Sequence, residues 1–364
     1  MNKQRYIKLF LTTLTLVSSL LIIHPATSTY AQQAATPGAL PAEATLTIGG
    51  YSTPAEGFAE IIPLFQADWE QKTGQKVSFQ QSYTGSGAQS RAIIGGFEAD
   101  IAALSLESDI TRIVDAKLIT HDWKNTKYKG LFGTSIVIFT VRPGNPKNIK
   151  DWADVAKPEI EVITPDPASS GGAQWNILAA VGAAIRGNVQ GYDKGEEGGY
   201  KFLGDVIKNV VVFDKDARSS FLTFEKGVGD VALTYENEYY AGLQAGQAAQ
   251  ANAAQYEPVY PSSTILIQNP VAVVDVYADK HGVRPAAEAF VEFLTTPQAQ
   301  TILAKHGYRP LDPSLAQDKD IVKLFPNVKD LFTIEEFGGW SKVSTEQFGE
   351  DGKVTKLIAT IKGQ

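Results

Sequence analysis

Residues 162–175 read Val-Ile-Thr-Pro-Asp-Pro-Ala-Ser-Ser-Gly-Gly-Ala-Gln-Trp, and this stretch decides the fold class. The β-branched residues at its start predict a short buried strand, and the apolar run over 173–185 predicts a helix. Between them stand Ser169, Ser170, Gly171 and Gly172. Serine caps the free amides of a first helical turn, and glycine lets a ligand approach the backbone. The stretch is therefore either a simple turn with a helix cap or an oxyanion site at a helix N-terminus.

The chain repeats this arrangement, which favours the binding site over the simple turn. Turns between a predicted strand and a predicted helix carry Gly, Ser or Thr at 49–54, 83–87, 168–172, 214–219 and 234–237. In parallel sheets such turns lie at the carboxyl edge, where α/β proteins bind ligands. Several helix N-termini that face one cleft suit a small, fully ionised anion, because a hydrogen bond to a charged group is worth roughly 1.5–3 kcal/mol.

Strands and helices alternate along the whole chain, so we expect an α/β fold with mostly parallel sheets. The predicted strands are 44–48, 76–82, 99–104, 133–141, 161–164, 209–213, 230–234 and 265–274. The predicted helices are 54–72, 88–95, 107–116, 151–156, 173–185, 200–208, 214–227, 285–294 and 297–305, with Ser52 or Thr53 as the cap of the first. We expect 191–199 to be a solvated loop and the Ala/Gln-rich segment 244–255 to be a helix tail or a mobile insert.

The composition is that of a globular protein and excludes several classes of site. The chain has 364 residues, of which 43% are hydrophobic and 20% charged, and this length indicates two domains or lobes. Cysteine is absent, which excludes disulfides, thiolate catalysis and cysteine-ligated zinc. None of the four histidines forms a His-x-x-x-His pair, so the pattern does not support a histidine metal site.

Residues 1–31 are typical of a secretory signal peptide. Lys3, Arg5 and Lys8 form its basic region, an apolar core follows, and small residues near Ala31 suit cleavage. Residues 32–43 are predicted to be a disordered spacer, and the mature protein is expected in the periplasm, with an uncleaved N-terminal anchor as the alternative. Without the leader, the chain keeps 30 of its 33 Lys and Arg residues and all 40 Asp and Glu residues. Its sequence contains no cluster of basic residues that would bind nucleic acid.

Ordered motifs along most of the chain carry a resemblance to a known family. They are Gln-Ser-Tyr-Thr-Gly-Ser-Gly at 81–87, Gly-Asn-Pro-Lys at 144–147, Val-Ile-Thr-Pro at 162–165, Ser-Gly-Gly-Ala-Gln-Trp-Asn at 170–176, Gly-Asp-Val at 229–231, Glu-Asn-Glu at 236–238, Ala-Val-Val-Asp at 272–275 and Phe-Gly-Gly-Trp at 337–340. In this order they resemble the periplasmic sulfate-binding proteins of bacterial ABC importers. The resemblance implies a two-lobed type II periplasmic binding protein, each lobe a mostly parallel sheet flanked by helices, with the ligand cleft between the lobes. It assigns 44–137 and 270–364 to the first lobe and 138–269 to the second.

The resemblance also implies a function and a set of ligand-binding residues. It implies a monomeric receptor, not an enzyme, that needs no cofactor or metal, captures sulfate and delivers it to the transmembrane subunits of an ABC permease. The dehydrated dianion would be held by the amide of Ser86, the hydroxyl of Ser170 and the amides of Gly171, Gly172 and Ala217. The sixth donor in well-known members is a tryptophan indole, where this chain has Tyr235, whose phenol both donates and accepts. The family's first turn often carries Asp where this chain has Ser52.

Other residues near these motifs receive different interpretations. We expect Arg218 to pair with a neighbouring carboxylate rather than to contact the anion. Residues 214–225 have Asp at positions one and three and Glu at twelve, but the fifth and sixth positions lack the oxygen ligand and the glycine of a calcium loop. Gly85-Ser86-Gly87 lacks the spacing of a nucleophile elbow, and no histidine lies nearby in the sequence.

Three functions remain open at this point. The first is a receptor for sulfate or a close analogue such as molybdate or thiosulfate, whose site consists of donors only. The second is a receptor for phosphate, which keeps a proton and therefore needs an acceptor carboxylate, either Asp216 or Glu236. The third is an exported hydrolase, which would need a serine and a histidine paired across the cleft.

Overall fold

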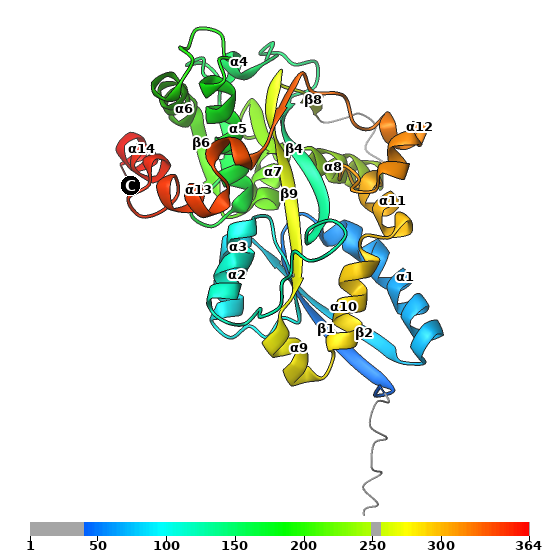
Figure 1. The fold of residues 1–364 in the computed structure, drawn as a ribbon. Helices are drawn as coiled ribbons and strands as arrows, with labels where there is room; N and C mark the ends of the chain where they lie inside the picture. The colour runs from blue at the N-terminus through cyan, green and yellow to red at the C-terminus, as the bar shows by residue number, and fades with distance from the viewer. Residues whose placement is uncertain (1–39, 249–255, 364) are drawn as a thin grey trace, which may run out of the picture. The chain divides into compact units, whose positions relative to one another are not determined.

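The structure is a computed structural model that describes residues 40–248 and 256–363. The predicted leader, most of the predicted spacer and part of the Ala/Gln-rich segment lie outside the described residues. Residues Pro41–Gln364 belong to one compact unit, whose ribbon is drawn in Figure 1. Among the described helices, none is both long enough and apolar enough to cross a bilayer.

The described strands form one mixed sheet. Its order is β2 (Lys76–Thr84), β1 (Glu43–Tyr51), β3 (Ile101–Ala103), β9 (Ser263–Val273), β4 (Leu131–Val141), β7 (Val231–Tyr235), β5 (Val162–Pro165) and β6 (Val210–Asp214), with β10 (Asp330–Phe332) beside β9 and β8 (Glu257–Val259) beside β4. The pairs β1–β2 and β1–β3 at one end and β5–β6 and β5–β7 at the other are parallel. The expected α/β class with two groups of parallel strands is therefore confirmed.

Two long antiparallel strands join these groups, which the sequence analysis did not anticipate. β4 pairs with β9 as far as Ile136 and with β7 from Val137 onward. β9 pairs with β4 as far as Pro270 and with β3 from Val271 onward. Figure 1 shows these two strands running side by side from one group of strands to the other.

The helices lie between and after the strands in the expected alternation. Their bounds are α1 (Ala55–Thr73), α2 (Ser86–Ile94), α3 (Glu107–Asp115), α4 (Trp152–Val155), α5 (Gly171–Ile185), α6 (Glu196–Asn209), α7 (Ala217–Glu225), α8 (Glu236–Ala248), α9 (Asp275–His281), α10 (Arg284–Phe293), α11 (Pro297–Lys305), α12 (Lys319–Val322), α13 (Trp340–Glu346) and α14 (Lys353–Lys362), with 3-10 turns at Pro313–Gln317 and Ile334–Phe337. Apolar side chains of α1 such as Phe58, Ile61 and Phe65 are buried in the main core, as their helical spacing predicted.

The expected cap of the first helix is wrong. Pro54 is the N-cap residue of α1 and makes no side-chain cap hydrogen bond. The Thr53 hydroxyl bonds instead to the Tyr308 hydroxyl at 3.0 Å, and the Ser52 hydroxyl accepts from the Arg218 amide at 3.5 Å. Both hydroxyls thus serve tertiary contacts, which local sequence does not reveal.

The expected loop at 191–199 is correct only to Gly195, because α6 begins at Glu196. Gly198 and Gly199 lie inside this helix and are buried. A Cβ at Gly199 would lie 2.6 Å from Ile185 Cγ1, so this glycine permits close packing of α6 on α5. At Gly198 and Gly199 the glycine content therefore reflects the packing of the helix rather than solvent exposure.

The Phe-Gly-Gly-Trp motif forms a turn that places one indole in the core. Gly338 and Gly339 have φ angles of 87° and 82°, which favour glycine. Trp340 then opens α13 and packs edge-on against Trp175 of α5, with ring centroids 4.6 Å apart. The tail is thereby joined to the helix that begins at the Ser-Gly-Gly turn.

Candidate functional site

Three helices begin at the residues predicted to bind an anion. α2 begins at Ser86 after strand β2, α5 at Gly171 after β5, and α7 at Ala217 after β6. The first-turn amides of a helix have no acceptor within that helix. Within the described part of the chain, the amides of Ser86, Gly171 and Ala217 also have no backbone acceptor elsewhere. These amides can therefore donate to a ligand, and the helix dipoles favour negative charge at the same place.

The N-termini of α5 and α7 lie against each other and beside the end of β7. A Cβ built on Gly172 would lie 3.2 Å from the Ala217 Cβ, 3.3 Å from Ser170 Oγ and 3.7 Å from Tyr235 Cζ. The structure thus brings four of the predicted residues together, all of them buried. The absence of a side chain at Gly172 leaves the backbone open to a ligand on this side.

The N-terminus of α2 meets the same group from the other end of the sheet. A Cβ on Gly85, which precedes Ser86, would lie 2.6 Å from the Ser169 carbonyl oxygen. Ser105 completes the contact, because its amide donates to Ser86 Oγ at 2.9 Å and its own Oγ lies 2.7 Å from the Cβ that Gly171 would carry. All six predicted residues therefore belong to one cluster.

The side chains of the cluster differ in what they can still donate. Ser86 Oγ donates to Asp109 Oδ2 at 2.5 Å, so its hydroxyl proton is used and only its amide is free. Ser170 Oγ accepts from the Ala173 amide at 3.4 Å as the N-cap of α5, which leaves its proton available. Tyr235 is fully buried, and burial raises the pKa of its phenol well above the ordinary value. It is therefore a neutral group that keeps its proton at neutral pH.

Ser105 is a site residue that the sequence analysis missed. It follows β3 and precedes α3, and its hydroxyl bonds to the Tyr235 hydroxyl at 2.6 Å. Its carbonyl accepts from the Trp175 indole at 3.1 Å. A strand-to-helix turn with serine was a usable signal here, but 103–107 contains no glycine and did not resemble the other turns.

The charged groups around the cluster pair with one another. Arg218, on the first turn of α7, pairs with Glu56 of α1 and, at 3.2 Å, with the buried Glu238 of α8. The expectation that Arg218 pairs with a carboxylate is therefore confirmed. Burial raises the pKa of Glu238 to about 7, although the nearby Arg218 opposes this shift. Burial likewise raises the pKa of Asp109, against the opposing charge of Arg112.

The two carboxylates that a phosphate site would need are both occupied. Glu236 accepts from two nitrogens of Arg309, at 2.7 and 3.0 Å. Asp216 is the N-cap of α7 and accepts from the Ser219 amide at 2.8 Å. Both of these carboxylates therefore already accept from the protein, whereas the amides of Ser86, Gly171 and Ala217 remain available to an anion.

The histidines outside the leader pair with carboxylates rather than with serines. His121 bonds to Asp275 at 2.8 Å, His281 to Asp100 at 2.7 Å, and His306 to Glu60 at 2.8 Å. Over residues 40–248 and 256–363, no group of three or more His, Cys, Asp or Glu side chains could hold a metal ion. Neither a serine–histidine pair nor a metal centre is formed by these described side chains.

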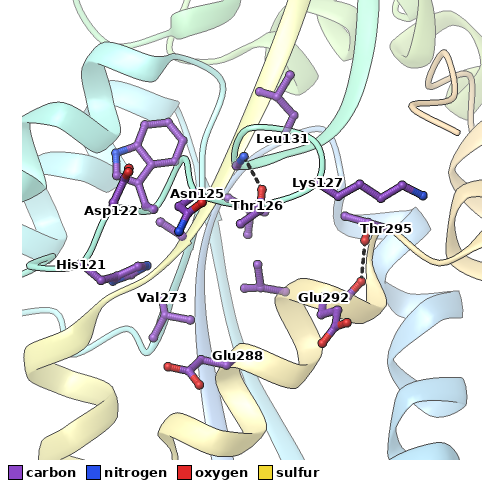
Figure 2. A pocket seen from close by; sticks show the side chains of 15 residues that line it. His121, Asp122, Asn125, Thr126, Lys127, Leu131, Val273, Glu288, Glu292 and Thr295 are labelled. Atoms are coloured by element: carbon purple, nitrogen blue, oxygen red, sulfur yellow. Dashed lines mark hydrogen bonds between the residues drawn. The ribbon is translucent and has the colours of Figure 1, made fainter.

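A separate cavity of about 410 Å³ lies away from the cluster and is drawn in Figure 2. It is lined by the segment 121–131, by β9 and by α10, and it includes none of the six predicted residues. Glu288 and Glu292 of α10 lie on its wall. Lys127 lies on the wall as well, so this cavity is lined by charges of both signs rather than by the neutral donors of the cluster.

Comparisons with known proteins agree on one relationship. A family model described as the bacterial extracellular solute-binding protein matches residues 46–309 of the chain. The chain is 43% identical over 325 residues to the sulfate-binding protein of Synechococcus elongatus, which covers 89% of each chain. It is 42% identical over 310 residues to the sulfate-binding protein of Escherichia coli, covering 84% of this chain and 91% of that one. Among solved structures, the sulfate-binding protein SubI from Mycobacterium tuberculosis H37Rv is similar with a TM-score of 0.73 and 38% identity, over 83% of this chain and 98% of that one.

Proposed function

The chain belongs to the bacterial extracellular solute-binding protein family, and from this premise we propose that it is a receptor that captures sulfate outside the cytoplasm for import. The observation that carries the proposal is the meeting of three helix N-termini, those of α2, α5 and α7, at one buried cluster of neutral donors. Sulfate carries no proton at neutral pH, so it can be bound by donors alone. The names of the similar proteins support the same ligand.

The proposed ligand shell combines main-chain and side-chain donors. The amide of Ser86 comes from one group of strands, and the hydroxyl of Ser170 with the amides of Gly171, Gly172 and Ala217 comes from the other; Tyr235 stands beside them. Neutral, fixed donors suit a dianion in an acidic protein, because they need no countercharge of their own and do not reorganise on binding. The pairing of Arg218 with two glutamates supports a shell without a contacting cation.

The proposed lobes are 44–137 with 270–364, and 138–269, except that the end of the C-terminal tail lies against the second lobe, where Lys353 pairs with Glu196 of α6 and Lys362 donates to the Val210 carbonyl. Their boundaries lie within one residue of the positions at which the connecting strands change partners, at Ile136 and Val137 in β4 and at Pro270 and Val271 in β9. Ser105 already contacts Tyr235 and lies beside Gly171 in this structure, so it corresponds to the closed arrangement, and opening about these two strands would separate these residues. Anion binding would then favour the closed arrangement, which holds donors from both lobes.

The remaining parts of the proposal concern the setting of the receptor. We propose that it acts as a monomer in the periplasm and delivers sulfate to the transmembrane subunits of an ABC permease. The described histidines outside the leader pair with carboxylates rather than with serines, which gives no support to a hydrolase.

Titration calorimetry of the purified protein tests the proposal. Sulfate, phosphate, molybdate and thiosulfate are titrated separately at neutral pH. Sulfate is expected to bind most tightly, because phosphate would leave its proton without an acceptor carboxylate. Tighter binding of phosphate than of sulfate would overturn the assignment, and so would the absence of heat with every one of these oxyanions.

A further inference from the structure

Ser105 holds a central position in the anion site, although no motif of the sequence marks it. Its side chain is fully buried. Its amide donates to Ser86 Oγ, its carbonyl accepts from the Trp175 indole, and its hydroxyl bonds to Tyr235. Ser105, which follows β3, thus bonds to Ser86 and Tyr235 of the cluster and to Trp175 of α5.

The hydroxyl of Ser105 lies over the first turn of α5. Its Oγ would be 2.7 Å from a Cβ on Gly171, so only glycine fits beside it. The amide of Gly171 is one of the proposed donors to the anion. The Ser105 hydroxyl therefore lies beside the residue that supplies this amide.

The Ser105–Tyr235 pair has one proton to spare. Two hydroxyls that share one hydrogen bond use one proton between them and leave the other free. A phenol is the stronger acid, so it is the better donor of the two, and Tyr235 keeps its proton because burial raises the pKa of its phenol. Tyr235 then donates to Ser105, and the proton of Ser105 remains for the ligand. Chains of hydrogen bonds strengthen each member, which improves Ser105 as a donor.

We propose that Ser105 is a ligand-binding residue of the anion site, oriented by Tyr235, and that this pair of hydroxyls determines how strongly the site rejects an oxyanion that retains a proton. The inference rests on the proposed function. Tyr235 is a positioning residue in this arrangement, and the sixth donor to the anion is the Ser105 hydroxyl.

The specificity follows from the chemistry of the donors. Main-chain amides only donate, and Ser170 Oγ already accepts from the Ala173 amide. The direction of the hydrogen bond between Ser105 and Tyr235 can reverse, because each hydroxyl can donate or accept. When the ligand is hydrogen phosphate, Ser105 can accept the ligand's hydrogen bond and donate its own proton to Tyr235, whose phenol proton then turns to another oxygen of the anion beside Gly172. The pair therefore lowers the discrimination between sulfate and hydrogen phosphate compared with a site built from donors alone.

The first test compares Ser105→Ala, Tyr235→Phe and the control Ser108→Ala by calorimetry with sulfate. Ser105→Ala keeps the backbone bonds to Ser86 and Trp175, so it removes only the hydroxyl. It is expected to weaken sulfate binding by roughly 10-fold or more, and Tyr235→Phe by a smaller factor. Ser108 is buried on α3 and its hydroxyl has no partner among the described residues, so its variant should stay within about twofold of wild type. Thermal unfolding of each variant verifies that it is folded.

The second test compares sulfate with hydrogen phosphate at pH 8 in the double variant Ser105→Ala/Tyr235→Phe. Wild-type protein should bind hydrogen phosphate measurably but more weakly than sulfate, and the double variant should raise the preference for sulfate by roughly a further 10-fold. Any one of three results overturns the inference. The first is a folded Ser105→Ala variant that binds sulfate within about twofold of wild type, and the second is an unchanged ratio of the Kd for hydrogen phosphate to the Kd for sulfate in the double variant. The third is no binding of hydrogen phosphate to the wild-type protein up to about 10 mM. A wild-type protein that does not bind sulfate would instead refute the proposed function.

Discussion

Replacing Gly171 by alanine tests the contact on which the closed site depends. Gly171 is the first residue of α5, and its backbone lies against the segment that follows β3. A Cβ at this position would lie 2.7 Å from Ser105 Oγ, 2.8 Å from Leu106 Cγ and 2.9 Å from Ser105 Cβ. These distances are all too short for a side-chain carbon, so the two segments must separate to admit the methyl group.

The magnitude follows from the cost of overpacking. Forcing an extra carbon into a tightly packed contact typically costs about 1–3 kcal/mol. Because separation of the two groups of strands relieves this clash, the cost falls on the closed arrangement and hence on binding. The Kd for sulfate should rise by roughly 5- to 150-fold, while the free energy of unfolding without sulfate should change less.

Titration calorimetry and thermal unfolding measure the two effects separately. Gly204→Ala is a matched control, because Gly204 lies inside helix α6 and its added Cβ would meet its nearest neighbours at 3.7 Å, an ordinary contact. This control should bind sulfate like the wild-type protein. Gly171→Ala protein that also binds sulfate within about twofold of wild type would refute the proposed closure onto α5.

Three further predictions concern stability. Burial raises the pKa of Glu238 to about 7, so the folded protein binds a proton that the unfolded chain releases, and the free energy of unfolding should fall as the pH rises from about 4.5 to 7. In urea unfolding, Glu238→Gln should reduce this fall by up to roughly 3 kcal/mol. The same pH dependence in the variant and in the wild-type protein would contradict the prediction. Burial would raise the pKa of Asp275, but bonds from the Thr120 amide and Arg284 hold the pKa well below its ordinary value. The ionised Asp275 therefore stabilises the fold above about pH 4, and this stabilisation is lost as the pH falls further. Asp275→Asn should lower the free energy of unfolding by roughly 2 kcal/mol at pH 7 and by less at pH 3. An equal loss at both pH values would refute this explanation. Trp340→Ala removes an indole packed at 4.6 Å from its partner and should cost roughly 3–5 kcal/mol, and an unchanged Tm would show that this packing contributes little.

Much of the fold and of the candidate site was predictable because its signals are local. The strand at Val162–Pro165, the cap at Ser170 and the apolar run of α5 follow one another directly in the sequence. Asp216 and Ala217 at the start of α7 carry the same kind of signal, a capping carboxylate after a β-branched run. Such signals depend on backbone geometry within a few residues, which the amino-acid pattern determines.

The remaining features depend on contacts between distant segments. Ser105 enters the site because Tyr235, 130 positions away, presents its hydroxyl there. Glu196 begins a helix earlier than its glycine-rich surroundings suggest, because Gly199 packs against α5. Similarly, Thr53 bonds to Tyr308 instead of capping α1. Periodicity and turn composition contain no information on such partners.

A crystal structure of the protein with selenate tests whether neutral donors from both ends of the sheet enclose one dianion. Selenate is a proton-free tetrahedral dianion like sulfate, and the anomalous scattering of selenium locates it without ambiguity. We expect one selenium peak within hydrogen-bond reach of the amides of Ser86, Gly171, Gly172 and Ala217 and the hydroxyl of Ser170. A peak in the cavity lined by segment 121–131 and α10, or an anion held by the Arg218 guanidinium, would contradict it.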